Sequence, residues 1–268
     1  MSRVLQLEIA SLVALMGMLV VNSADAQSVT KNGTTVFDAG GFELDTVGAQ
    51  PGAPPIGSWL QIEPGNPVNM GVYGPASGGP GAALGNNYLH AFRPNDPSNA
   101  YLRAGFSQSV ATGDHLHLST WVYLDQVPPL TNALFLGFES ADLSTRLWLA
   151  TTDIPSAAPG TYRPQVLQGG AGSDLIDIPY TPRQWQEWTI DWIVGSSEAT
   201  FGIAGATQTR MVSAGPLSTP ITEVRFASSN FPTTFYLDGR AVPEPSSFVL
   251  MGLGLIGAGA WRLRQRVK

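Results

Sequence analysis

The sequence predicts an all-β protein, a two-sheet antiparallel β-sandwich of the jelly-roll kind, over residues 27–241. In this region hydrophobic residues alternate with polar ones over short runs, which is typical of strands with one buried face. Gly- and Pro-rich segments, such as 158–164 and 214–220, separate the runs and indicate turns. This region has no long helical period, and because no unit of about 20–50 residues repeats, a solenoid is not expected.

Three runs define which side chains share a face of their strand. In the run 115–124 four aliphatic residues alternate with His115, His117, Trp121 and Tyr123. The run 144–151 sets two leucines against Arg146 and Trp148. In the run 187–194 one face holds two tryptophans and two aliphatic residues: Trp188, Ile190, Trp192 and Val194. The aliphatic sets, together with Trp185, Trp188 and Trp192, are predicted to form the core.

The order of these features resembles the concanavalin-A-like (laminin-G or lectin-type) sandwich. In that family a W-x-x-W strand, here Trp185–Trp188, precedes a hairpin and a final strand that carries Asp-Gly, here Asp238–Gly239. A galactose-binding-like jelly roll has much the same pattern and remains the alternative. The stretch 49–85, which is dense in Gly and Pro, is expected to form long loops.

The N-terminus has the three parts of a secretory signal peptide. Arg3 gives a short basic region, residues 9–21 are almost wholly apolar, and Ala24 and Ala26 satisfy the small-x-small cleavage rule. We therefore expect residues 1–26 to form a signal helix that signal peptidase removes, with Gln27 as the first mature residue.

The C-terminus combines a short motif, an apolar segment and a cluster of cations. Residues 248–261 would form a helix of about 21 Å, short of the ~30 Å hydrocarbon core, so we expect a short transmembrane helix. Arg262, Arg264 and Arg266 follow it and would stop transfer.

With the motif Val242, Pro243, Glu244 and Pro245, residues 242–268 resemble the PEP-CTERM sorting domain of Gram-negative bacteria. The resemblance implies an inner-membrane-tethered precursor that an exosortase-type protease cuts. It also implies delivery to the cell surface or extracellular matrix, where many members are linked to extracellular polysaccharide.

Composition excludes several classes of function. The net charge is −6, and five of the fourteen cations lie at the two ends of the chain, so nucleic acid is not an expected partner. The chain has no cysteine, which excludes disulfides, thiolate metal sites and a Cys nucleophile.

Catalytic and metal-binding patterns are weak. The Glu-x-Asp-x-x-Glu pattern of sandwich glucanases is absent, and Glu187 and Asp191 are expected about 13 Å apart on one strand face, too far for a hydrolytic pair. No cofactor is expected, although calcium is left open with Asp38, Glu43 and Asp238 as candidate ligands. The alternative for Asp38 and Asp238 is turn capping.

The strongest ligand candidates are aromatic. Trp121 and Tyr123, with His117, leave the core side of their strand together, and Trp148 shares a face with Arg146. If the two strands are neighbours, these residues form one platform on which sugar rings can stack; otherwise the aromatic faces belong to the core. The sequence thus favours a non-catalytic, surface-sorted protein that binds or organises extracellular polysaccharide. A divergent glycan hydrolase or lyase on the same scaffold, and a purely structural envelope or matrix protein, are the alternatives.

Overall fold

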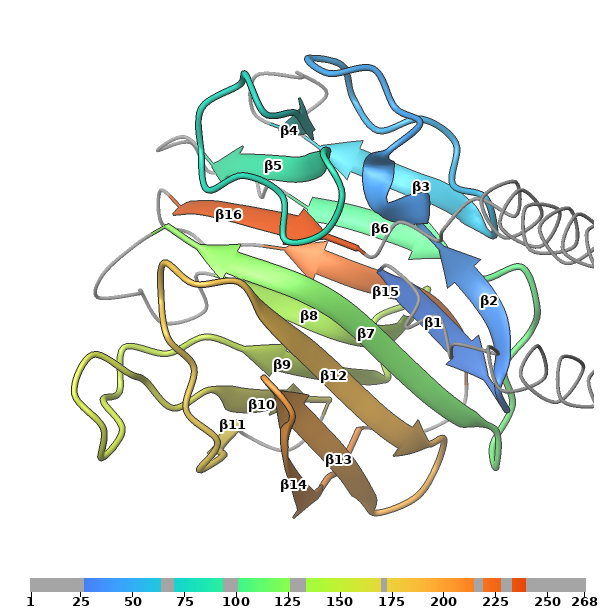
Figure 1. Cartoon of the computed structure of the whole chain (residues 1–268). Coiled ribbons are helices and arrows are strands. Elements are labelled where there is room, and N and C mark those ends of the chain that lie inside the picture. The colour runs from blue at the N-terminus through green and yellow to red at the C-terminus, as the bar shows by residue number, and fades with distance from the viewer. Residues whose placement is uncertain are drawn as a thin grey trace, which may run out of the picture.

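A computed structural model describes residues 27–63, 70–93, 101–125, 134–169, 173–214, 219–227 and 233–239. Within these ranges the chain forms two antiparallel sheets that pack face to face (Figure 1). The expected signal helix, the expected transmembrane helix and the sorting motif lie outside the described residues. No helix within the described residues is both long and apolar enough to cross a membrane.

The nine-stranded front sheet is built around the ten-residue strand β7. Its strands, in spatial order, are β14 (Ala206–Met211), β13 (Glu198–Ile203), β12 (Gln186–Ile193), β7 (His115–Leu124), β16 (Thr233–Asp238), β5 (Tyr88–Arg93) and β4 (Met70–Tyr73). Strand β1 (Ser28–Lys31) pairs with the first half of β7, and β2 (Thr34–Asp38) pairs with β1. A short 3-10 helix, η1 (Gly40–Phe42), follows β2.

The seven-stranded back sheet lies behind the front sheet in Figure 1. Its order is β11 (Ser173–Leu175), β10 (Gln165–Gln168), β9 (Arg146–Ala150), β8 (Phe135–Ser140), β15 (Ile221–Ala227), β6 (Tyr101–Gly105) and β3 (Ser58–Glu63). The predicted two-sheet antiparallel sandwich is therefore confirmed.

The core lies between the sheets and is made by alternation along each strand. Leu116, Leu118, Val122 and Leu124 of β7 are buried, as are Leu147 and Leu149 of β9. Their alternation partners lie on the outer faces, as the sequence predicted. Trp188 and Trp192 are 1% and 2% exposed, which places both in the core, whereas Trp185 is half-buried outside it.

The Gly- and Pro-rich stretch is not wholly loop. It contains strands β3 and β4. Each has only a few alternating residues, and Gly and Pro surround them, so the sequence pattern does not reveal the strands. The remaining part, residues 74–87, forms a long loop that crosses the outer face of the front sheet from β4 to β5 (the teal segment in Figure 1). This loop divides that outer face into a covered part and an open part.

Candidate functional site

Strand β7 positions the predicted aromatic residues on the outer face of the front sheet. Trp121 and Tyr123 are half-buried there, while the even-numbered residues of β7 point into the core. Trp121 lies directly opposite Glu187 of β12 on one side and Asp238 of β16 on the other. Among the described residues no other ring stacks on the Trp121 indole. Its ring is therefore the open aromatic surface of this face.

Tyr123, in contrast, joins a cluster of rings beneath the loop 74–87. Its ring centroid lies 5.6 Å from that of Trp185 and 5.7 Å from that of Tyr236. The cluster continues toward the edge of the sheet through Tyr88, His90 and Tyr73. The Trp185 indole N–H donates to the carbonyl of Gly81 at 2.9 Å, which ties the cluster to the loop. This ring cluster forms one border of the open part of the front sheet's outer face.

The three candidate calcium ligands serve as hydrogen-bond acceptors for loop backbone. Asp38 accepts from Gly40 N, and Glu43 accepts from the N–H groups of Asn86 and Asn87. Asp238 accepts from Leu84 N at 2.9 Å and from Gly239 N at 2.6 Å. These contacts are what turn-capping carboxylates make, and those of Glu43 and Asp238 hold residues 84–87, the end of the loop that leads into β5.

Burial of Asp238 has an electrostatic consequence. The side chain is fully buried, and this burial raises the pKa of Asp238 to about 7, although backbone N–H donors partly oppose the shift. Nearby His90, which is buried between Tyr73 and Tyr236, shows the opposite effect, because burial lowers the pKa of its imidazole to about 4. Two titratable groups under the loop therefore stay largely uncharged in weakly acidic solution.

Beyond Trp121 the open face is polar. Asp191 Oδ1 lies 2.9 Å from His117 Nδ1 and 3.3 Å from His115 Nε2, and the Ser119 hydroxyl donates to Glu187 Oε1 at 2.7 Å. Burial favours the neutral form of Asp191, but the hydrogen bonds and charges of the two histidines outweigh it and hold its pKa below the ordinary value. The row ends at an open hollow of about 700 Å³ at the β12–β13 hairpin.

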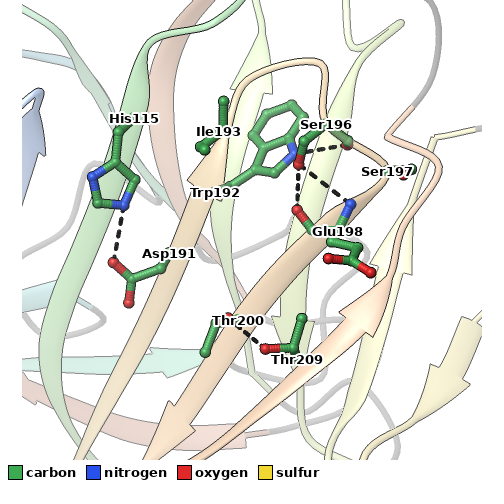
Figure 2. A pocket seen from close by; sticks show the side chains of 9 residues that line it. All are labelled: His115, Asp191, Trp192, Ile193, Ser196, Ser197, Glu198, Thr200 and Thr209. Carbon is green, nitrogen blue, oxygen red and sulfur yellow. Dashed lines mark hydrogen bonds and ion pairs between the residues drawn. The ribbon is translucent and has the colours of Figure 1, made fainter.

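Figure 2 shows this hollow from close by, with the His115 imidazole facing the Asp191 carboxylate and Thr200 paired with Thr209. We name the surface from the hollow to Trp121 the Trp121 face: Trp121, Glu187, Ser119, His117, Asp191 and His115. From His115 to Trp121 it extends about 20 Å at ~3.3 Å per residue. The described residues contain no group of three or more His, Cys, Asp or Glu side chains that could hold a metal ion.

Arg146 and Trp148 do not join this surface. Strand β9 belongs to the back sheet and β7 to the front sheet, so the two predicted halves of the platform lie on opposite outer faces. Trp148 is only 7% exposed, because Phe135 stacks on it at 4.7 Å and the Arg146 guanidinium lies 5.1 Å from its ring centroid. The single platform expected from neighbouring strands is therefore wrong.

Sequence reasoning also missed a buried charge network on the back sheet. Glu139 of β8 and Glu223 of β15 lie directly opposite each other and are fully buried. They are 84 positions apart in the chain, and only the strand pairing brings them together. Each glutamate is next in the chain to a buried hydrophobic residue, Phe138 or Val224, and this alternation indicates that its side chain points to the outer face. It does not indicate that β8 and β15 pair.

The comparison with family models identifies the C-terminal tail. Residues 241–265 match the model of the PEP-CTERM protein-sorting motif, so the chain carries this motif at its C-terminus. The motif implies an exported, cell-surface protein that an exosortase processes. Comparison with curated proteins finds no match.

Solved structures with a similar fold include lectins and glycan-active enzymes. A sialidase matches with 15% identity and a TM-score of 0.39 over 63% of this chain and 16% of its own. The botulinum neurotoxin serotype D binding domain matches with 10% identity and a TM-score of 0.46 over 81% and 47%. Lectin II from Ulex europaeus matches with 10% identity and a TM-score of 0.37 over 64% and 93%. All three TM-scores are below 0.5, so the two-sheet sandwich rests on the strand pairing of this chain itself.

Proposed function

We propose that this exported protein binds extracellular polysaccharide at the Trp121 face without cleaving it. The observation that carries the proposal is the partly exposed Trp121 indole, which has no ring stacked on it among the described residues and lies beside Glu187. Apolar C–H faces of sugars pack on flat aromatic rings, while carboxylates and imidazoles beside the ring bond the hydroxyls. The polar row toward the hollow provides such groups over a length that suits several sugar units.

The charges on this face favour binding over hydrolysis. A general acid must hold a proton near the working pH, yet the pKa of Asp191 is lowered by its two histidines. Glu187 and Asp191 are four residues apart on β12, about 13 Å at ~3.3 Å per residue, which exceeds the separation in glycoside hydrolases.

One observation favours glycan hydrolysis as a second candidate. Asp238 has a pKa of about 7, as a general acid needs, and it lies two strand spacings (about 10 Å) from Glu187, with Trp121 between them. However, Asp238 is fully buried and already accepts two backbone N–H groups. A substrate would have to displace the loop 74–87 to reach it, so binding remains the conclusion.

Trp121→Ala separates a binding role from a core role. If the ring is a sugar platform, the variant loses polysaccharide binding by about tenfold or more, but the free energy of unfolding falls by only about 1 kcal/mol or less. Denaturant melts and binding titrations on the same purified samples measure both quantities.

The matched control is Trp188→Ala on the neighbouring strand. Trp188 is 1% exposed, so its removal leaves a cavity and should cost about 3–5 kcal/mol of stability. A loss of that size for Trp121→Ala would assign Trp121 to the interior and contradict the proposal.

Delivery to the surface requires the C-terminal signal, and we propose that residues 242–268 act separately from the domain 27–241. Glu244→Ala should prevent exosortase cleavage while membrane insertion continues, because the variant alters the motif but keeps the apolar segment and its cations. Immunoblotting of membrane and extracellular fractions should then show an uncut, membrane-held precursor. Normal release of the variant would show that cleavage does not depend on Glu244 and would contradict this role of the motif.

A further inference from the structure

The outer face of the back sheet carries three of the chain's fourteen Lys and Arg residues. We name it the arginine face: Arg103, Arg146 and Arg225 with the rings of Phe135 and Trp148. Phe135 and Trp148 stack on each other, and the Arg225 guanidinium lies 5.9 Å and 5.7 Å from their centroids. The Arg146 guanidinium lies 5.1 Å from the Trp148 centroid. Two guanidinium groups therefore lie over a pair of aromatic rings, an arrangement stabilised by cation–π attraction.

Two carboxylates hold part of this layer in position. Glu223 binds Arg103 at two points, with Oε2 2.8 Å from Nε and Oε1 2.5 Å from Nη2. Glu139 lies 3.4 Å from Arg225 Nη1 and 3.5 Å from Arg103 Nε. Both carboxylates are fully buried, whereas the side chains of Arg103 and Arg225 are 25% and 13% exposed. Solvent therefore meets the cations of this network and not its anions.

Arg146 forms no ion pair with the two glutamates of this network. It lies directly opposite Glu139 across the β8–β9 pair, but Glu139 forms its ion pairs with Arg103 and Arg225 instead. Among the described residues no carboxylate pairs with Arg146. In addition, the indole N–H of Trp148 is buried and has no acceptor there. Within the part of the chain that the structure describes, the site thus combines three guanidinium groups with two carboxylates and one buried N–H donor that has no acceptor.

From this arrangement we infer a second binding site, for an oxyanion carried on an acidic polysaccharide. A guanidinium offers paired N–H donors that match the two oxygens of a uronate carboxylate or of a sulfate ester. One such group meeting Arg146 would supply the carboxylate-like partner that Arg146 lacks among the described residues. Since the whole chain has a net charge of −6, its long-range field does not favour a polyanion, so recognition depends on this local cluster.

This site is independent of the Trp121 face, because the two lie on the outer faces of different sheets. A protein with both sites can hold two polysaccharide segments on its opposite sides. That property would let a surface-sorted protein link chains of the matrix, and it goes beyond binding at a single face.

The test measures binding of the purified full-length protein to polygalacturonate, dextran sulfate and neutral dextran. We expect Arg146→Gln to weaken binding to the acidic polymer that the wild type prefers by about tenfold, and Arg146→Lys to recover only part of the loss. The matched control is Arg210→Gln, which removes a half-exposed arginine paired with Asp177 on the front-sheet edge and should bind like the wild type. Thermal melts check that each variant is folded.

Trp121→Ala separates the two sites. It should leave the Arg146-dependent binding intact, even if the proposed function at the Trp121 face fails. Preference for polygalacturonate assigns a carboxylate ligand, and preference for dextran sulfate assigns a sulfate ligand. The inference is overturned if Arg146→Gln binds as tightly as the wild type, or if Trp121→Ala, which lacks the first site, binds neutral dextran as well as both acidic polymers.

Discussion

Arg103→Met is expected to lower the free energy of unfolding by about 3–5 kcal/mol near neutral pH. The substitution keeps an unbranched apolar stem but removes the guanidinium that binds Glu223 at two points and also contacts Glu139. Glu223 is fully buried and would keep a charge that solvent does not reach, while Glu139, also fully buried, would retain only its ion pair with Arg225. Denaturant unfolding of the wild type and the variant measures the difference.

The double variant Arg103→Met, Glu223→Met is the control for this explanation. Removing both members of a buried ion pair leaves no unpaired charge between them, so the double variant should recover most of the stability that the single variant loses. If Arg103→Met costs less than about 1 kcal/mol, or if the double variant is worse than the single one, the network does not stabilise the back sheet in this way.

Asp238→Asn should change how stability depends on pH. Because the pKa of Asp238 is about 7 in the folded protein and near 3.8 when unfolded, the folded state holds its proton more tightly between these values. Its contribution to stability is therefore complete below pH 4 and is lost as the pH rises toward 7. A shift of about three pKa units corresponds to roughly 4 kcal/mol. The stability difference between the wild type and Asp238→Asn should drift by an amount of that order over this range.

His90→Gln is the reciprocal variant. The pKa of His90 is lowered from 6.5 to about 4, so its contribution to stability is present above pH 6.5 and is lost as the pH falls toward 4. In the wild type the two groups act in opposite directions. Asp238→Asn should therefore steepen the loss of stability on acidification, and His90→Gln should reduce it. Urea melts at half-unit pH steps measure the free energy of unfolding of both variants as a function of pH. If both substitutions shift this pH dependence in the same direction, the assigned burial is contradicted.

Much of the fold could be predicted because alternation along a strand is a local property. The sequence of β7 separates Leu116 and Leu118 from His117 and Trp121 without any knowledge of neighbouring strands, and burial follows that division. The same reasoning placed Trp188 and Trp192 in the core. Where turn-forming residues are dense, as around β3 and β4, the pattern is too short to indicate a strand.

The candidate sites could be predicted only in part, since they depend on which strands are neighbours. Trp121 and Trp148 have similar local patterns, yet pairing places one on each sheet. Glu139 and Glu223 meet only through the β8–β15 pair. Asp238 was expected to cap a turn or bind calcium, and its fully buried position depends on the loop 74–87 above it. Non-local pairing of this kind leaves no periodic signal in the sequence.

Size-exclusion chromatography of the protein with a neutral extracellular polysaccharide, which the arginine face does not bind, tests the central claim most directly, because it reports binding and chain length together. We expect the wild-type protein to elute with the polysaccharide at an unchanged polysaccharide size after long incubation, and Trp121→Ala to elute separately. Progressive shortening of the polysaccharide, abolished by Glu187→Gln or Asp238→Asn, would show that the face is catalytic and would contradict a purely binding role. Co-elution of Trp121→Ala to the same extent as the wild type would show that the Trp121 face is not the binding site.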